Sequence, residues 1–264
     1  MARIAVAATA PFGADVLERL AERHEIAYLM TQPDRPSGRG RRVSPPAAKQ
    51  TAETLGIPVR QPERLGEDFD PEVETIVAVA YGQLVPRGAL DRARWLNVHP
   101  SLLPRWRGAA PVERALIAGD EETGVTIIEL VEALDAGPIA AQDRFGVGID
   151  DDAGAVFARA AEVTPGLIDA ALGNREPAPQ PDEGATYAEK IAPADRELDW
   201  SRPAEELHNL IRALSPHIGA RGLVDGRPAI VWRSRLVDGK LELLEVQPDG
   251  RRRMTYDEFL RGLR

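Results

Sequence analysis

The stretch that decides the fold runs from residue 97 to residue 111 and reads NVHPSLLPRWRGAAP. It follows an apolar segment, Thr75–Ala80, whose composition predicts a buried strand. Its three prolines exclude a long helix and favour extended backbone in the residues that precede them. Asn97 and His99 are two residues apart, so on an extended segment both side chains project from one face.

These two side chains have the chemistry of an active site. An imidazole titrates near neutral pH and can take up or give a proton. An amide N–H can donate to a carbonyl oxygen that gains negative charge during nucleophilic attack. The pair also fits a plainer interpretation, a strand end with a hydrogen-bonded histidine and a turn asparagine. The two residues by themselves leave both interpretations open.

The residues that precede this stretch predict a doubly wound α/β domain with a mostly parallel sheet. Ile4–Ala8 is a continuous apolar run, as expected for a strand buried on both faces. Apolar residues at helical spacing follow to about Arg23, and Ile26–Met30 predicts a second strand. This β-α-β opening with short connections is typical of that class. The first turn lacks the G-x-G-x-x-G pattern, so no NAD or FAD site is expected.

A second candidate site residue, Asp135, lies in the turn Leu134–Pro138, which follows a predicted strand at 123–130. Ligands of open α/β sheets bind beyond the carboxyl ends of strands, where His99 is also expected. By itself, Asp135 fits a turn former better than a catalytic residue. The other elements predicted around it are helices at 47–55, 84–90, 112–118 and 151–172 and strands at 57–59 and 139–146.

Residues 31–46, TQPDRPSGRGRRVSPP, contain four prolines and two glycines and predict a long exposed loop without regular structure. The loop contains four arginines, Arg35, Arg39, Arg41 and Arg42. Clustered arginines suit bidentate contact with phosphate groups, and long loops inside compact domains are usually functional or disordered. A solvated basic loop is the alternative.

The last third of the chain changes character. Residues 174–186 are rich in proline and predict a linker between a catalytic domain at 1–173 and a smaller domain at 187–264. The smaller domain is predicted to contain an amphipathic helix that ends at Leu214 and three strands near 218–224, 229–232 and 241–246. Asp-Gly pairs between the strands predict hairpins, and Thr255 with Glu258 predicts a capping box.

Composition narrows the classes of function. The 264 residues include no cysteine and four scattered histidines, so no disulfide, thiol nucleophile or zinc site is expected. No apolar run reaches the roughly 20 residues that span a bilayer. A net charge of −9 argues against a general nucleic-acid binder but allows a local basic surface. We therefore expect a cytoplasmic protein, and we expect a monomer.

The run at 97–111, together with Leu134–Gly137, resembles the N10-formyltetrahydrofolate-dependent formyltransferase and hydrolase superfamily. The longer pattern SLLPRWRGAAP and the loop TQPDRPSGRG resemble its methionyl-tRNA formyltransferase family in particular. The resemblance implies 10-formyltetrahydrofolate as co-substrate, methionyl-tRNA as acceptor and no metal. It implies catalytic roles for Asn97, His99 and Asp135, a folate pocket lined by Ser101, Leu102, Leu103 and Pro104, and RNA contact by Arg35, Arg39, Arg41 and Arg42.

The reaction that the resemblance implies is attack of an amine on a formyl carbon. Asn97 and a protonated His99 are expected to stabilise the resulting oxyanion, and His99 is expected to carry the proton. Asp135 is expected to orient the imidazole and to raise its pKa, since a nearby carboxylate favours the charged form.

Two features leave alternatives open. Segments such as Tyr187–Ile191 and Ile211–Pro216 resemble the family's C-terminal OB-like barrel, which helps to hold tRNA. The chain is shortened after Val237, however, and a barrel needs a set number of strands, so this one is expected to be open or completed by a partner. The alternatives are a formyltransferase for an amino-sugar nucleotide or another small amine, and a non-catalytic folate- or RNA-binding relative. The basic loop counts against the former, and the complete catalytic set counts against the latter.

Overall fold

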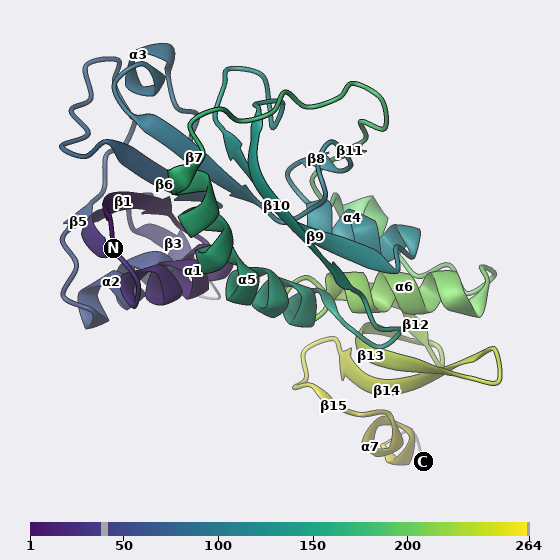
Figure 1. The fold of residues 1–264 in the computed structure, drawn as a ribbon. Coiled ribbons are helices and arrows are strands. Elements are labelled where there is room, and N and C mark those ends of the chain that lie inside the picture. The colour runs from purple at the N-terminus through teal and green to yellow at the C-terminus, as the bar shows by residue number, and fades with distance from the viewer. Residues whose placement is uncertain (38–41, 263–264) are drawn as a thin grey trace. The chain divides into compact units, whose positions relative to one another are not determined.

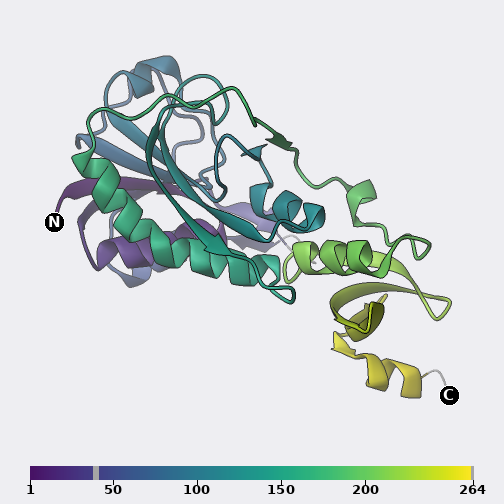
Figure 2. The same cartoon turned by 45° about the vertical axis from the view of Figure 1, so that its right-hand side comes forward.

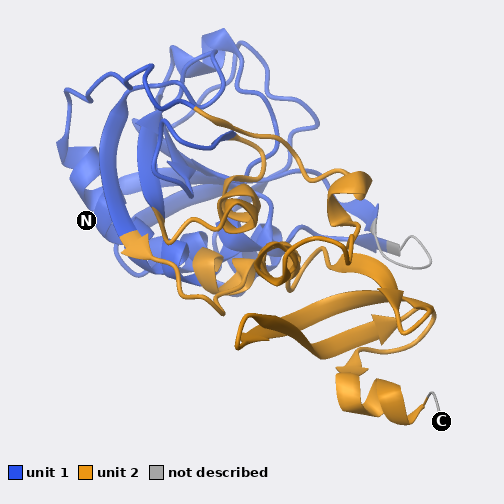
Figure 3. Cartoon of the chain, turned by 90° about the vertical axis from the view of Figure 1, so that its right-hand side faces the viewer, with its two compact units in different colours: residues 1–107, 124–144, 158–185 blue, residues 108–123, 145–157, 186–264 orange. Residues whose placement is uncertain are grey.

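The computed structural model describes residues 1–37 and 42–262, which form two compact units (Figure 3). The first unit comprises Met1–Arg107, Gly124–Arg144 and Ala158–Ala185. The second comprises Gly108–Thr123, Phe145–Phe157 and Thr186–Arg264. The chain passes between the units more than once, and the predicted division at residues 174–186 stays a prediction.

A seven-stranded sheet forms the centre of the first unit, with the strand order β10-β9-β7-β6-β1-β2-β5 (Figure 1). The strands are β1 (Arg3–Ala8), β2 (Glu25–Met30), β5 (Val59–Arg60), β6 (Thr75–Val79), β7 (Arg94–His99), β9 (Glu122–Glu129) and β10 (Ile139–Gly146). Neighbouring strands from β5 to β7 are parallel, whereas β9 pairs with β7 in the antiparallel sense. The prediction of a doubly wound, mostly parallel α/β sheet is confirmed.

The periodicity of the sequence explains these elements. The apolar residues of β1 and β6 are buried, as expected for strands covered on both faces. Helix α1 (Pro11–Ala21) buries Val16, Leu17 and Leu20 along one stripe and packs against β1, β2 and β6. The other helices of this sheet are α2 (Ala47–Thr54), α3 (Arg87–Leu90) and α5 (Ala153–Gly173). An Arg23–Asp169 ion pair joins the residues that follow α1 to α5. Figure 2 shows the ribbons of these two helices.

The prediction that residues 31–46 lack regular structure is wrong. Strands β3 (Arg35–Ser37) and β4 (Arg42–Ser44) form a two-stranded antiparallel ribbon in which Pro36 pairs with Val43. A proline is tolerated in such a ribbon because each strand has a free edge, where a missing N–H costs nothing. Arg39 and Arg41 lie outside the described residues.

The second unit is built around α6 (Ala204–Leu214) and a four-stranded antiparallel sheet in the order β12-β13-β14-β15. These strands are β12 (Ala220–Val224), β13 (Arg227–Val237), β14 (Lys240–Pro248) and β15 (Met254–Thr255). Shorter elements of the chain are β8 (Arg107–Gly108), which pairs with β11 (Tyr187–Ala188), α4 (Pro111–Ala118), a 3-10 turn (Pro193–Arg196) and α7 (Tyr256–Arg261). Asp225-Gly226 and Asp238-Gly239 both have positive φ, as tight hairpin turns require. The predicted capping box is confirmed, because the Thr255 hydroxyl accepts a hydrogen bond from the Glu258 amide.

This sheet is open among the described residues. β12 and β15 are its two outer strands and do not pair with each other, so this chain alone does not close the sheet into a barrel. Completion of the sheet by a partner chain stays a prediction. The core of the unit lies between the sheet and α6, where Leu207, Leu210 and Ile211 pack against Val231 and Val246. No helix within the described part of the chain is long and apolar enough to cross a membrane.

Candidate active site

Strand β7 places Asn97 and His99 near the middle of the first unit's sheet. Asn97 lies between Ala78 of β6 and Ile128 of β9, and His99 lies opposite Thr126. Because the strand is paired on both sides, its register fixes both Cα positions, and the period of two places both side chains on one face. His99 is only 4 % exposed.

Asp135 reaches this face from the loop between β9 and β10. Because β9 is antiparallel to β7, it ends beside Leu96, and the loop begins near the amino end of β7 rather than at its carboxyl end. Asp135 has a φ of 48° and is buried. One carboxylate oxygen lies 3.7 Å from His99 Nδ1, and the other accepts a hydrogen bond of 3.4 Å from Asn97 Nδ2. The structure thus brings together the three side chains that the sequence predicted to converge.

The remaining ring nitrogen of His99 fixes the tautomer. Nε2 lies 2.8 Å from the carbonyl oxygen of Trp106. A carbonyl oxygen can only accept, so Nε2 carries a proton and donates it, and Nδ1 faces Asp135. Trp106 has a φ of 67°, a left-handed backbone conformation that few residues other than glycine adopt.

Burial lowers the pKa of His99 below its ordinary value, and the Asp135 carboxylate and the Trp106 carbonyl oppose this effect without reversing it. The desolvation of a fully enclosed imidazolium is therefore the dominant influence on its charge. Asp135 raises the pKa of His99, as expected, but burial outweighs this effect, so the net shift disfavours the protonated imidazole that the sequence led us to expect. With Nε2 bonded to the Trp106 carbonyl, Nδ1 is the ring nitrogen directed at the Asp135 carboxylate, and the lowered pKa favours the neutral form of the ring.

Ser101–Pro104 form a turn that hydrogen bonds with the side chains of Thr126 and Gln142 hold in place. The hydroxyl of Thr126 donates to the Ser101 carbonyl oxygen and accepts from the Leu103 amide. The side chain of Gln142 donates to that same hydroxyl and to the Leu103 carbonyl oxygen. Ser101 and Leu103 are buried, whereas Leu102 and Pro104 are partly exposed. Only the latter two can touch a ligand without a rearrangement.

A cavity of about 640 Å³ lies in the first unit, beside segments that follow β6 and β9. Its lining residues are Gln32, Arg35, Glu63–Leu65, Gly82–Arg87 and Glu132, and Ser101–Pro104 are not among them. Leu84 is 90 % exposed, which is unusual for a large apolar side chain next to a buried strand. Sequence analysis missed this lining. The apolar pair Leu84-Val85, which begins five residues after the end of β6, was the available signal.

The arginines predicted to contact RNA are only partly described. Arg35 is exposed, lines this cavity and donates a hydrogen bond of 3.0 Å to Gln32 Oε1. Arg42 begins β4, and the structure describes its backbone alone. Contact of these four arginines with RNA therefore stays a prediction.

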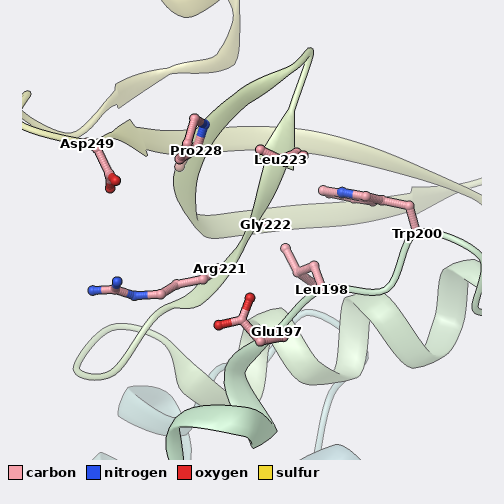
Figure 4. Close-up of a pocket in the computed structure, with 9 residues that line it drawn as sticks. Glu197, Leu198, Trp200, Arg221, Gly222, Leu223, Pro228 and Asp249 are labelled. Atoms are coloured by element: carbon pink, nitrogen blue, oxygen red, sulfur yellow. The ribbon is translucent and has the colours of Figure 1, made fainter.

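A second cavity, of about 400 Å³, lies in the second unit beside β12 (Figure 4). Glu197, Trp200, Arg221 and Asp249 are among its lining residues. None of the predicted site residues belongs to it, so the candidate active site is in the first unit. Among residues 1–37 and 42–262, no group of three or more histidine, aspartate or glutamate residues is placed to hold a metal ion.

Comparison with known proteins places the chain in a family. The formyl transferase model matches residues 2–172, and the model of the formyl transferase C-terminal domain matches residues 190–240. A methionyl-tRNA formyltransferase of Paracoccus denitrificans is 40 % identical over 291 aligned positions, which cover 99 % of this chain and 97 % of the relative. The alignment, with 291 positions, is longer than this chain of 264 residues, so the relative contains residues that have no counterpart here.

Solved structures show the same fold. A methionyl-tRNA formyltransferase from Clostridium thermocellum superposes with a TM-score of 0.68 at 16 % identity, covering 94 % of this chain and 99 % of that one. A sugar 3N-formyl transferase, solved in the presence of dTDP and 5-N-formyl-THF, superposes with a TM-score of 0.66 at 15 % identity, covering 90 % and 87 %. With a family model matched over residues 2–172 and a relative 40 % identical over nearly its whole length, the chain belongs to the formyl transferase family.

Proposed function

We infer that this protein transfers a formyl group from 10-formyltetrahydrofolate to the α-amino group of methionyl-tRNA. The observation that carries formyl transfer is the convergence of Asn97, His99 and Asp135 on one face of β7. The choice of methionyl-tRNA as acceptor is supported by the near-full-length identity to an enzyme of that name.

The side chains suit the reaction because it needs one oxyanion donor and one proton carrier. The amine nitrogen forms a bond to the formyl carbon, the carbonyl oxygen becomes an oxyanion, and the bond from that carbon to N10 of the folate then breaks. The amine loses one proton and N10 gains one, so no other reactant is needed. Asn97 Nδ2 supplies a hydrogen-bond donor for the oxyanion. His99 Nδ1, unprotonated beside Asp135, accepts the amine proton and returns it to N10.

Asp135 supports this transfer through charge. When His99 Nδ1 takes up the proton, the buried imidazolium is stabilised by the carboxylate 3.7 Å away. His99 Nε2 stays bonded to the Trp106 carbonyl throughout, which keeps the ring in one orientation. The imidazole of His99 is therefore neutral before the reaction and is positively charged only while it carries the amine proton.

The cavity beside Gly82–Arg87 is the proposed folate site. Its volume of about 640 Å³ falls within the range of small-molecule pockets, roughly 300–1,000 Å³. The strands that lead into its lining, β6 and β9, are the two neighbours of β7, so the cavity and the catalytic set come from adjacent strands. The exposed Leu84 offers an apolar contact for a flat ring. Within Ser101–Pro104, Leu102 and Pro104 are the proposed contacts.

The β3–β4 ribbon is the proposed contact with tRNA. Replacing Arg41 and Arg42 together with alanine should weaken tRNA binding and flatten its dependence on salt, because each lost phosphate contact lowers the salt slope by roughly 0.7–0.9. The measurement is tRNA affinity between about 50 and 200 mM salt. Substitution of the exposed Glu183 by alanine serves as the control and should leave the slope unchanged. An unchanged slope in the double variant would remove these two arginines from the interface.

One experiment separates the proposed function from its alternative. The alternative is formylation of an amino-sugar nucleotide, and the similarity in fold to a sugar 3N-formyl transferase favours it. Methionyl-tRNA and a dTDP-linked amino sugar are offered to the enzyme in parallel with 10-formyltetrahydrofolate. Formylation of methionyl-tRNA alone is the expected result. Formylation of the sugar alone would establish the alternative, and no formylation of either would reject both.

A further inference from the structure

Gln180 lies in the proline-rich segment that the sequence predicts to be a linker, yet its side chain is bonded to the loop that holds Asp135. Its Nε2 donates to the carbonyl oxygen of Asp135 at 2.8 Å and to that of Gly137 at 2.6 Å. Its Oε1 accepts two hydrogen bonds from Arg107, at 3.1 Å from Nε and 2.9 Å from Nη2. The amide thus uses both of its donors and both acceptor positions.

The orientation of this amide is fixed by chemistry. A guanidinium can only donate, so the oxygen of Gln180 must face Arg107 and the NH₂ group must face the loop. The backbone holds the side chain in place, because Ala178 exchanges two hydrogen bonds with Ile139 at the start of β10. The segment therefore runs beside the Asp135 loop and does not act as a free tether at this point.

The loop needs such support because its conformation is unfavourable for an isolated chain. Asp135 has a φ of 48°, in the left-handed region that L-residues seldom adopt. At Gly137 a Cβ atom would overlap the carbonyl oxygen of Glu129, so the backbone passes very close to the end of β9. A hydrogen bond to the carbonyl of Asp135 itself fixes the peptide plane next to the residue whose carboxylate faces His99.

Arg107 connects this brace to the histidine side of the site. It directly follows Trp106, whose carbonyl oxygen accepts the proton of His99 Nε2. Its side chain is buried, with 7 % exposed, and its guanidinium bonds to Gln180. A closed circuit of contacts thus runs from His99 through Trp106, Arg107 and Gln180 to Asp135 and back to the imidazole.

We propose that Gln180 and Arg107 are positioning residues that hold the Asp135 carboxylate against His99. Neither is expected to touch the substrate. This inference rests on the proposed function, in which Asp135 stabilises the imidazolium of His99. It assigns to the segment after α5 a part in catalysis in addition to its role as a connection.

The test compares Gln180→Met with wild type in the full-length protein. Methionine has a similar length but cannot donate to the two carbonyls. We expect kcat to fall by about 100-fold, as for a catalytic group displaced by about 1 Å, with KM for both substrates unchanged. A merely structural role would not move the titration of His99. We expect its pKa, followed by NMR of the ring protons, to fall further, because the carboxylate that raises it is no longer held in place.

Four companion variants make the outcome decisive. Gln180→Glu keeps an oxygen that accepts from Arg107 but removes the donor to the two carbonyls, so its kcat should fall as in Gln180→Met. Arg107→Lys should retain a higher kcat than Arg107→Met. Glu183→Ala, an exposed change in the same segment, should behave as wild type. Wild-type kcat and an unchanged His99 titration in both Gln180 variants, with Asp135→Asn inactive, would overturn this inference alone. Full activity in Asp135→Asn would instead remove Asp135 from the mechanism, and absence of formyl transfer in the wild type would overturn the proposed function.

Discussion

Strand β7 and the loop between β9 and β10 both contribute side chains to the candidate active site, but different forces hold them. Asn97 and His99 belong to a strand that is paired on both sides, so backbone hydrogen bonds fix their positions. Asp135 belongs to a loop with left-handed backbone, and side chains from distant segments fix its position. The difference shows that one site can combine a rigid local frame with a group that depends on tertiary contacts.

This contrast predicts where substitutions act. A change on β7 should remove a chemical group and leave the frame intact, whereas a change in the loop can disturb both the group and its geometry. The following predictions test that distinction, in order of decreasing effect.

The largest effect is expected for Asn97→Ala. Loss of an oxyanion donor should lower kcat by about 10² to 10³, because the oxyanion loses a preorganised hydrogen bond. The free energy of unfolding should change little, because the pairing of β7 is made by the backbone. Steady-state kinetics and urea unfolding measure the two quantities. Wild-type kcat would show that Asn97 has no part in the transition state.

Asp135→Ala should follow, with a fall in kcat of about 10² or more. Without the carboxylate, the buried imidazolium that carries the proton has no compensating charge. Single-turnover formylation measures the chemical step directly. Asp135→Asn is the matched variant, since it preserves shape and removes only the charge. Unchanged turnover in both variants would remove Asp135 from the mechanism.

Gly137→Ala tests the geometry of the loop without touching a reacting group. The added Cβ meets the Glu129 carbonyl oxygen, so we expect the free energy of unfolding to fall by about 1–3 kcal/mol and kcat to fall with it. Gly166→Ala is the control, because it lies in α5 with open space around its Cβ position. It should raise the free energy of unfolding by about 0.5–1 kcal/mol at unchanged kcat. Equal changes in the free energy of unfolding for Gly137→Ala and Gly166→Ala would contradict the close backbone approach at Gly137.

The smallest effect concerns pH. Burial lowers the pKa of His99 in the folded protein below 6.5, so between the two values the unfolded chain binds a proton that the folded protein does not. The free energy of unfolding should therefore decrease as the pH falls from 6.5 through the folded pKa, by at most about 1.4 kcal/mol per pH unit. His24 contributes in the same direction, since its pKa is also lowered. Urea unfolding of wild type and His99→Gln across this range isolates the share of His99. If the free energies of unfolding of wild type and His99→Gln change in parallel with pH, His99 does not take up a proton on unfolding in this pH range.

Much of the fold could be predicted because it depends on local patterns. The apolar run of β1, the helical spacing of α1 and the Asp-Gly turns of the C-terminal sheet all appear in the structure. The ribbon of β3 and β4 could not be predicted from composition, because the four prolines of the segment concealed two short strands, of which only β3 contains a proline, Pro36, tolerated at a free edge. The cavity lining at Gly82–Arg87 was missed because its one signal, the apolar pair Leu84-Val85, is too short to distinguish a site from an ordinary loop.

The sequence by itself determined the sheet, the family and the identities of the three candidate catalytic side chains. Their periodicity and motif spacing are properties of neighbouring residues. Only the tertiary structure decided how Asp135 is held and in which direction the pKa of His99 shifts. Asp135 is 38 residues from Asn97 and 45 from Gln180, and the pKa of His99 is set by enclosure that no local pattern records. Desolvation and long-range hydrogen bonds arise only when distant segments pack, which is why they lie beyond the reach of sequence patterns.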